Sequence, residues 1–481
     1  MIFNSLTYLL LLLVVVLFYW VLPYKARLIL IFSSSLIFYG FWNIIFIPVL
    51  LISVIVDWWV AQKILYHKKQ IRFFLLLFSL SVNLGLLFYF KYLIFFAESS
   101  IGLANLLGAE LDPIAFNIIL PLGISFYTFQ TISYTVDVYR GFIKPERNFV
   151  LFACYVTFFP QLVAGPILRA AEVIPQFMKR PLFSFNFIFA GVRLILFGLF
   201  LKVVLADNIS VLVDSGFEIN PEYMSAIDVW TLAFLFGFQI YFDFSAYSLI
   251  ALGSARMIGI IFPNNFNFPY ISTSPKDFWK RWHISLSSWI RDYIYLPLNK
   301  VIVHDRSLGG LEKAFKKQGN KKSLFFTMGI MGLWHGANWT FLIWGIYHAI
   351  FISLYRLIEP NTRSLPEWFR FSAGIFITLP IIMLSWIPFR ANSLTDALNM
   401  WSKIFNPSAY LWLGMRENIY LITFLTLIGF FIVYFFNKKI APIIKSKKYI
   451  AILCDTILIM FITSLVIIFF RSINQFIYFQ F

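Results

Sequence analysis

The sequence predicts an all-α polytopic membrane protein, and three observations support this fold class. Hydrophobic residues make up 60% of the 481 residues and charged residues only 13%, whereas soluble proteins carry roughly 25% charged residues. Apolar runs repeatedly approach the ~20 residues that an α-helix needs to cross a bilayer. Basic residues gather in short loops after alternate runs, which is typical of cytoplasmic loops. We therefore expect one integral membrane domain over residues 1–481.

The apolar runs predict a bundle of about 11–12 transmembrane helices. The expected spans are residues 6–22, 28–42, 44–62, 72–96, 114–138, 184–206, 229–256, 323–336, 338–358, 371–390, 418–437 and 450–470. The first span follows no basic segment and precedes no small-residue cleavage site. We therefore expect it to be retained and not removed as a signal peptide.

The charge distribution predicts the orientation of the bundle. The basic loops lie at residues 25–27, 63–72, 140–147, 313–322 and 438–448, and the loops between them are acidic or neutral. Placing the basic loops in the cytoplasm puts both termini outside. The net charge of +17 follows from this bias. Nucleic acid is not an expected partner, because the basic residues do not share one soluble surface.

One apolar segment, residues 149–168, does not read as a simple crossing. It carries Pro160, Gly165 and Pro166, and proline removes a backbone donor and kinks a helix. Broken backbone at membrane depth is tolerated only where protein buries it or water reaches it. We expect a re-entrant segment here.

A second unusual segment, residues 274–300, carries too many charges to cross a membrane. Its aromatic residues recur at helical spacing, while most of its charges lie away from them. Ser274, Pro275 and Asp277 form the start signal of a helix. The segment is expected to be an amphipathic helix at the cytoplasmic interface.

The histidines supply the main candidates for chemistry. His67 and His304 lie in basic loops and are expected to be solvated, whereas His335 lies in the apolar stretch MGLWHGANWTF. An ionisable residue at membrane depth is by default a functional hypothesis, and the alternative is a hydrogen-bonded core histidine. His348 lies about three helical turns further on. It is expected to be a supporting or packing residue.

The neighbours of His335 favour a functional role. Gly332 and Gly336 are expected to leave space for a substrate beside the imidazole, and Trp334 precedes it. Asn338 is expected to orient the ring or to donate a hydrogen bond to a developing oxyanion.

His283 and Asp243 are the remaining polar candidates. His283 lies among Lys280, Arg281, Trp282 and Arg291. It belongs either to a solvated basic face or to a site that a polyanionic donor enters from the cytoplasm. Asp243, with Gln239 and Tyr247 nearby in the sequence, forms either a structural hydrogen-bond network or part of a substrate path.

Other chemistries find no support in the sequence. Cys154 and Cys454 have no neighbouring Cys or His pattern, so neither a disulfide framework nor a metal site is expected. The chain also lacks a nucleotide-binding loop, a GxSxG elbow and an HExxH motif. A nucleotide-driven pump, a conventional serine hydrolase and a zinc protease are therefore not expected.

Several motifs together resemble one family. FQIYFDFSAYS (238–248), SPKDFWKRWHISLSSWIRDYIYLPL (274–298) and GLWHGANWTFLIWGIYHAI (332–350) occur in the order found in the membrane-bound O-acyltransferase family. SFYTFQTISYTVDVYRG and FFPQLVAGPILR also resemble its bacterial branch, the membrane subunits of alginate and peptidoglycan O-acetyltransferases. The resemblance covers roughly residues 30–400, which would form the family core, with C-terminal helices at 418–470. Leu249 and Ala349 depart from the branch, which often has Asp and Gly there.

The resemblance implies a function. An acyl group would pass from a thioester donor, expected to be acetyl-CoA, through the bundle to a hydroxyl of an extracytoplasmic polysaccharide or peptidoglycan. His335 would be the catalytic histidine, either as a general base or through a covalent acyl-imidazole, and His283 the second. With such a donor, we expect Lys280, Arg281 and Arg291 to meet the coenzyme A phosphates, and Trp282 either to pack against the donor or to anchor the interface. No permanently bound cofactor is implied.

The resemblance also implies a location and partners. The chain would lie among the lipids of a bacterial cytoplasmic (inner) membrane. An extracytoplasmic acetyltransferase of the SGNH type or similar would complete the reaction. Two alternatives remain at this point: a transporter or flippase of a polysaccharide or lipid intermediate, with His335 and Asp243 in a substrate or proton path, and a non-catalytic scaffold.

Overall fold

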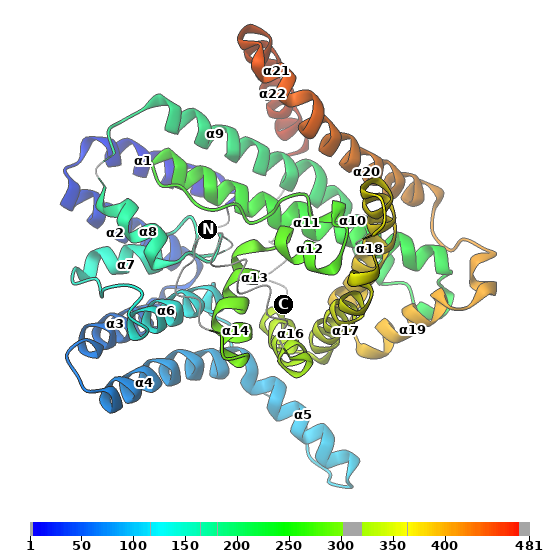
Figure 1. Ribbon diagram of the computed structural model, residues 1–481, viewed down its shortest axis with the longest axis horizontal. Helices are drawn as coiled ribbons and strands as arrows, with labels where there is room; N and C mark the ends of the chain where they lie inside the picture. The colour runs from blue at the N-terminus through cyan, green and yellow to red at the C-terminus, as the bar shows by residue number, and fades with distance from the viewer. Residues whose placement is uncertain are drawn as a thin grey trace. The chain divides into compact units, whose positions relative to one another are not determined.

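The computed structural model describes residues 3–115, 117–163, 165–179, 181–301, 320–362 and 364–470. All regular elements in these residues are helices (Figure 1), which confirms the all-α prediction. Eight of their helical segments are long and apolar enough to cross a membrane. The expected number of about twelve spans also counted shorter helices, such as Leu6–Val21 and Lys321–His335.

The described residues divide into two compact units that interleave along the chain. One contains residues 3–192, 251–263 and 291–301, and the other contains residues 193–250, 264–290 and 320–470. His304 and most of the predicted basic loop 313–322 lie outside the described residues. The prediction of a single membrane domain stays a prediction.

The first unit is built mainly from helices that precede residue 193. They are α1 (Leu6–Val21), α2 (Tyr24–Asn43), α3 (Ile47–Ile64), α4 (Lys69–Leu87), α5 (Leu93–Leu106), α6 (Ile124–Tyr139), α7 (Phe149–Thr157), α8 (Ala170–Met178) and the start of α9 (Phe185–Leu199), with the end of α11 (Ala226–Met257) and α14 (Leu296–Leu298). Helices α3, α4 and α6 pack on one another. At their contact, the buried Asp57 carboxylate accepts hydrogen bonds from Ser79, Asn83 and Thr135. Such bonds offset the cost of burying a carboxylate at this depth.

Residues 149–168 form a broken, buried segment, as the prolines and glycine predict. Helix α7 ends at Thr157, and the described residues from Phe158 to Leu168 are buried without forming a helix. The expected span 114–138 is shorter than predicted, because helix α6 begins only at Ile124. Gly123 precedes it with φ +70°, and a Cβ there would lie 2.2 Å from the Leu162 carbonyl oxygen. Gly123 therefore lets the broken segment approach the start of α6. Membrane re-entry itself stays a prediction.

The second unit holds the histidine motifs. Its helices are most of α9, α10 (Asp207–Phe217), most of α11, α12 (Pro275–Arg281), α13 (Ile284–Ile290), α16 (Lys321–His335), α17 (Trp339–Thr362), α18 (Glu367–Arg390), α19 (Leu394–Ile404), α20 (Glu417–Phe435), α21 (Ala441–Ser446) and α22 (Lys448–Phe469). The bounds of α11, α16, α17, α18, α20 and α22 agree with the predicted spans to within a few residues, whereas no span was predicted for the shorter helices α10, α19 and α21.

The prediction of one amphipathic helix over 274–300 is wrong. The Ser274 hydroxyl accepts a hydrogen bond from the Asp277 backbone N–H at 3.1 Å, and Pro275 opens α12 as expected. The helix then ends at Arg281, because His283 adopts φ +42° and the Ile284 N–H donates to the Asn265 carbonyl instead of continuing the helix. A second short helix, α13, follows the break.

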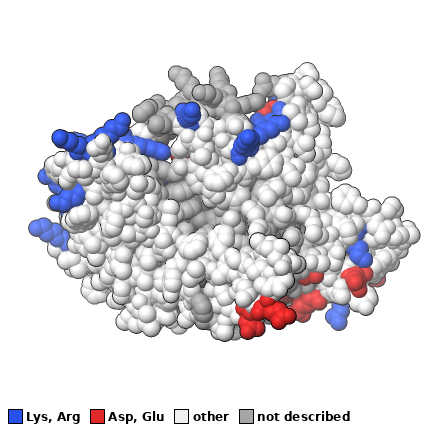
Figure 2. All heavy atoms as spheres, turned by 90° about the horizontal axis from the view of Figure 1, so that it is seen from below, with Lys and Arg blue, Asp and Glu red and all other residues white. Residues whose placement is uncertain are grey.

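The surface has the character expected next to lipid. Most of the face drawn in Figure 2 carries neither basic nor acidic side chains. Helices α20 and α22 expose large apolar side chains along their length, including Phe424, Ile432, Leu453 and Phe461. Such a surface is stable in lipid and would associate in water.

Candidate active site

His335 is the last residue of α16, at the tip of a helical hairpin. Gly336 follows in an extended conformation with φ −155°, which ends the helix. Helix α17 begins at Trp339 and returns along α16, since these two helices share the most extensive helix–helix contact in the described chain. The His335 side chain is buried, with 3% of its surface exposed.

The glycines of this α16–α17 hairpin serve packing. A Cβ on Gly332 would lie 2.2 Å from the Phe341 carbonyl oxygen, and one on Gly345 would lie 2.2 Å from the Met328 carbonyl oxygen. A Cβ on Gly336 would lie 2.1 Å from the Phe341 ring. The prediction that Gly332 and Gly336 leave space for a substrate is therefore wrong. Gly332 and Gly345 let the two helix backbones touch, as small residues do between membrane helices, while Gly336 leaves room for the Phe341 ring.

Aromatic rings surround the His335 imidazole. Ring centroids lie 5.0 Å away for Trp334, 5.0 Å for Trp344 on α17 and 5.3 Å for Phe389 on α18. Trp386 packs on Trp344 and Phe389 behind them, at 6.0 and 5.4 Å. We call Trp334, Trp344, Trp386 and Phe389 the aromatic enclosure. It keeps bulk water away from the imidazole.

His348 reaches the same enclosure from α17. Its ring lies 4.8 Å from Trp344, 5.0 Å from Trp279 and 6.0 Å from Phe278. Along a straight helix His335 and His348 would lie about three turns apart, but the hairpin brings both against Trp344. Within the described chain, neither ring nitrogen of His348 has a hydrogen-bond partner. Its supporting role stays a prediction.

His283 is fully buried, so the alternative of a solvated basic face is wrong. Its Nδ1 lies 3.2 Å from the Asn265 Oδ1, and its ring packs 4.6 Å from Phe244. Trp334 lies between the two histidine motifs, 5.9 Å from His283 and 5.0 Å from His335. Burial lowers the pKa of His283 to about 3. Its imidazole is therefore neutral at physiological pH.

The predicted donor-binding residues have different surroundings. Lys280 is exposed, while the Arg281 Nε donates to the Asp277 carboxylate at 3.0 Å. Trp282 is fully buried and packs 4.8 Å from Trp386, so its side chain forms part of the core. Arg291 belongs to the other compact unit, where its Nε donates to Asp292 at 2.7 Å. A joint role of these residues stays a prediction.

Asp243 forms a buried ion pair that the sequence did not predict. The Lys202 Nζ lies 2.9 Å from the Asp243 carboxylate and 2.8 Å from the Asp207 carboxylate. Lys202 lies in a π-helical segment, Phe200–Ala206, and 5.7 Å from the Tyr247 ring. A lone lysine in an apolar span was the available signal. Gln239 is buried on the same helix as Asp243, α11.

Asn338 has a helix-capping role that the sequence did not predict. The side chain is exposed, and its Oδ1 accepts a hydrogen bond from the Thr340 N–H at 3.0 Å. This bond satisfies a free donor at the start of α17. A role of Asn338 beside the His335 ring stays a prediction.

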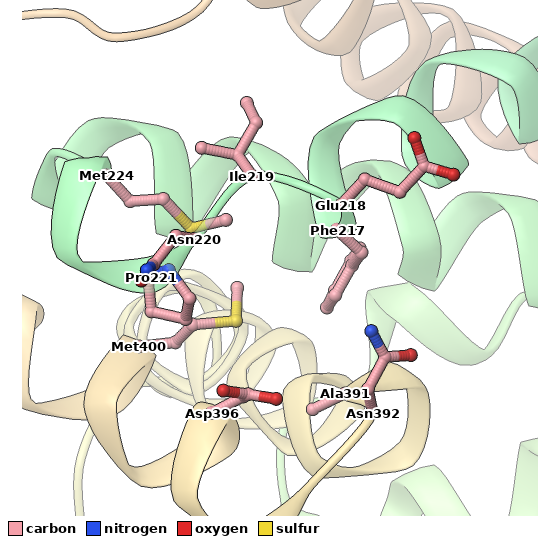
Figure 3. Close-up of a pocket in the computed structure, with 10 residues that line it drawn as sticks. All are labelled: Phe217, Glu218, Ile219, Asn220, Pro221, Met224, Ala391, Asn392, Asp396 and Met400. Carbon is pink, nitrogen blue, oxygen red and sulfur yellow. The ribbon is translucent and has the colours of Figure 1, made fainter.

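A pocket of about 200 Å³ lies elsewhere in the second unit, between the end of α10 and the start of α19. Figure 3 shows Glu218 and Asp396 at its rim, with Phe217, Met224 and Met400 supplying apolar walls. None of the predicted site residues lines it.

Comparisons with known proteins point in one direction. Residues 145–395 match the sequence profile described as the membrane-bound O-acyltransferase family. A probable alginate O-acetylase of Azotobacter vinelandii is 36% identical over 411 residues, which cover 84% of this chain and 78% of the relative. A peptidoglycan O-acetyltransferase of Helicobacter pylori is 36% identical over 397 residues, which cover 76% of this chain and 71% of the relative. A teichoic acid D-alanyltransferase of Streptococcus thermophilus is 30% identical over 289 residues, which cover 56% of this chain and 68% of the relative.

Proposed function

Because this chain belongs to the membrane-bound O-acyltransferase family, we propose that it transfers an acetyl group from cytoplasmic acetyl-CoA to a hydroxyl of an extracytoplasmic glycan. The chain is an O-acyltransferase in a membrane. Relatives named as alginate and peptidoglycan O-acetyltransferases support acetyl as the acyl group and a polysaccharide as the acceptor. The resemblance to the bacterial branch supports a cytoplasmic membrane location.

The observation that carries the proposal is the position of His335. It is a buried histidine at the tip of the α16–α17 hairpin, enclosed by rings of Trp334, Trp344 and Phe389. Acyl transfer to a hydroxyl needs a base for the hydroxyl proton and protection of the thioester from water. A buried imidazole inside an aromatic enclosure meets both needs.

The reaction balances with His335 as the general base. The acceptor hydroxyl oxygen attacks the thioester carbonyl carbon while His335 takes the hydroxyl proton. When the tetrahedral intermediate collapses, the carbon–sulfur bond breaks and the protonated His335 returns its proton to the thiolate. The products are an ester and a thiol. His283, neutral and joined to His335 through Trp334, would act as the second histidine of the site.

A partner completes the proposal. The predicted outer segments at 207–228 and 391–417 hold only short helices such as α10 and α19, whereas a folded domain needs about 50 residues or more. A separate extracytoplasmic acetyltransferase, of the SGNH type or similar, would therefore grip the polymer. Purified chain in vesicles should then acetylate polymeric acceptor far more slowly than chain plus partner. Full-rate acetylation by the lone chain would remove the need for a partner.

The test of the catalytic role uses purified protein, acetyl-CoA and a hydroxyl acceptor. We expect coenzyme A release that His335→Ala lowers by about 10²- to 10⁴-fold, the usual cost of losing a general base. The matched control is His67→Ala, since His67 is exposed and its Nδ1 lies 2.8 Å from the Lys63 carbonyl oxygen, outside the proposed site. A transporter would release no coenzyme A in either protein, and retention of more than about a tenth of the activity would contradict the role of His335.

A further inference from the structure

The proposed acyl transfer needs a hydrogen-bond donor that stabilises the oxyanion. The inference below names this hydrogen-bond donor and rests on the proposed function. When the thioester carbonyl becomes tetrahedral, negative charge develops on its oxygen, and a preorganised N–H or O–H group must stabilise it. Asn338, the candidate from the sequence, is exposed and caps α17. The hydrogen-bond donor is therefore better sought among the buried groups that contact His335.

Three buried indoles in the second unit offer unused donors. Trp282, Trp344 and Trp386 expose 0%, 0% and 1% of their surfaces, and their Nε1–H groups have no hydrogen-bond partner in the described structure. Leaving a buried N–H unsatisfied is unfavourable, because the group loses its hydrogen bonds to water and gains none in the protein. Such groups in a folded protein call for an explanation, and one explanation is a catalytic role.

Trp344 differs from the other two by its position. Its ring lies 5.0 Å from the His335 ring, at an interplanar angle of 83°. Trp386 lies one ring further away, 6.0 Å from Trp344, and Trp282 packs behind Trp386 at 4.8 Å. Of these three unpartnered indole donors, only that of Trp344 belongs to a ring in contact with His335.

The hairpin holds Trp344 rigidly in this position. Gly345, the next residue, lies in backbone contact with Met328 on α16, since a Cβ there would come within 2.2 Å of the Met328 oxygen. Gly332 makes the reciprocal contact with Phe341 on α17. Two backbone contacts therefore fix the distance between His335 at the end of one helix and Trp344 on the other. An oxyanion donor needs this preorganisation.

We propose that the Trp344 indole N–H donates the hydrogen bond that stabilises the oxyanion. As the hydroxyl oxygen bonds to the carbonyl carbon, His335 takes the proton and the carbonyl π electrons move to oxygen, which accepts the Trp344 hydrogen bond. The intermediate then re-forms the carbonyl, the carbon–sulfur bond breaks, and His335 gives the proton to the departing thiolate. Trp344 keeps its own proton throughout.

The test is Trp344→Phe, which removes the N–H and keeps an aromatic ring. We expect kcat for coenzyme A release to fall by about 10²- to 10³-fold, the usual cost of losing an oxyanion donor. KM for acetyl-CoA should stay near the wild-type value, because the oxyanion exists only in the transition state. A purely structural role would lower the thermal midpoint without this split between kcat and KM.

The matched control is Trp58→Phe. The Trp58 indole N–H is also buried without a partner in the described structure, but its ring packs on Phe149 in the other unit and not on His335. Its kcat should stay near the wild-type value. Trp334→Phe serves as a second arm, since Trp334 also contacts His335. If Trp334→Phe loses kcat while Trp344→Phe keeps it, the assignment is overturned.

A second measurement covers the case in which Trp344→Phe does not fold. Replacement of Trp344 by benzothienylalanine keeps the shape of the indole and exchanges its N–H for sulfur. The same loss of kcat supports the proposal, and wild-type kcat overturns it. If the wild-type chain itself releases no coenzyme A, the proposed function fails; if the wild type is active and both Trp344 variants are too, only this inference fails.

Discussion

Two buried ionisable residues in the second unit avoid being isolated charges in different ways, one by staying neutral and one by pairing. His283 is buried with its Nδ1 beside Asn265, and burial lowers its pKa to about 3. Lys202 lies between the carboxylates of Asp207 and Asp243. Both arrangements avoid an isolated charge away from water, which would cost far more than either.

His283 should make the protein less stable in acid. Its pKa is lower in the folded than in the unfolded chain, so the unfolded chain binds the extra proton first as the pH falls below about 6.5. Between pH 7 and pH 5 this removes about 2 kcal/mol of stability. His283→Asn tolerates the left-handed backbone and should flatten the dependence. The readout is the thermal midpoint at pH 5, 6 and 7, and equal slopes in both proteins would contradict the burial of a neutral imidazole.

Lys202 should be worth more to stability than a surface ion pair. Lys202→Met leaves the Asp243 carboxylate buried without its cation, which typically costs about 3–5 kcal/mol. The matched control is Arg390→Met, because the Arg390–Asp214 pair lies at the end of a predicted span, has side chains 21% and 52% exposed, and should contribute about 1 kcal/mol or less. Thermal midpoints in one detergent compare the two. Similar losses would mean that Lys202 is not held as the structure describes.

The role of a single residue could be predicted from the sequence when its own neighbours in the chain indicated that role, and not when the role depended on a distant partner. His335 was predicted because a histidine in an apolar run is conspicuous. The structural role of Lys202 was missed because its ion-pair partner, Asp243, lies on a different helix. The helix-capping role of Asn338 was missed because it depends on the residue at which α17 begins.

The helices themselves were predictable and their breaks were not. Apolar runs determine where a membrane helix lies, so the bounds of α17, α18 and α22 agree with the predicted spans to within a few residues. The break at His283 depends on the bond between the Ile284 N–H and the distant Asn265. The hairpin contact between α16 and α17 likewise depends on which glycines face each other. The sequence alone does not show this, because it depends on how the two helices pack.

The α16–α17 hairpin should tolerate a methyl group at one glycine and not at another. Gly345→Ala places a Cβ 2.2 Å from the Met328 oxygen, so the helices must separate; overpacking typically costs about 1–3 kcal/mol. Activity should fall with stability, because Trp344 moves away from His335. Gly329→Ala is the matched control on the same hairpin.

The control has a defined expectation. A Cβ on Gly329 would meet only the Leu342 side chain at 3.4 Å, an ordinary contact. Alanine is the better helix former by about 1 kcal/mol. Gly329→Ala should therefore keep its activity and match or exceed wild-type thermal stability. Equal losses in the two variants would show that the helices do not touch where the structure places the contact.

For the whole molecule, composition predicted the membrane environment and the all-α class, since both follow from averages over the chain. The division into two units did not follow from the sequence. Residues 251–263 and 291–301 join the unit made by the first 192 residues, and such long-range contacts leave no trace in local hydropathy. The orientation across the membrane rests on the charge of the loops alone.

That orientation can be measured with two introduced cysteines. Cys154 and Cys454 are first replaced by alanine. Glu218→Cys should then react with a membrane-impermeant thiol reagent in intact cells, while Lys445→Cys should react only after permeabilisation, because the positive-inside rule places its loop in the cytoplasm. Both positions are exposed in the structure, so access to the reagent depends on the side of the membrane. Labelling of Lys445→Cys from outside would reverse the whole topology.

The interleaving of the two units sets an order for biosynthesis. The ribosome releases the first 192 residues before the pieces at 251–263 and 291–301 that complete their unit exist. The helices of the first 192 residues therefore cannot complete the packing of their unit until these later segments have been synthesised. Assembly of this protein consequently cannot proceed as two independent folding events, one after the other, during translation.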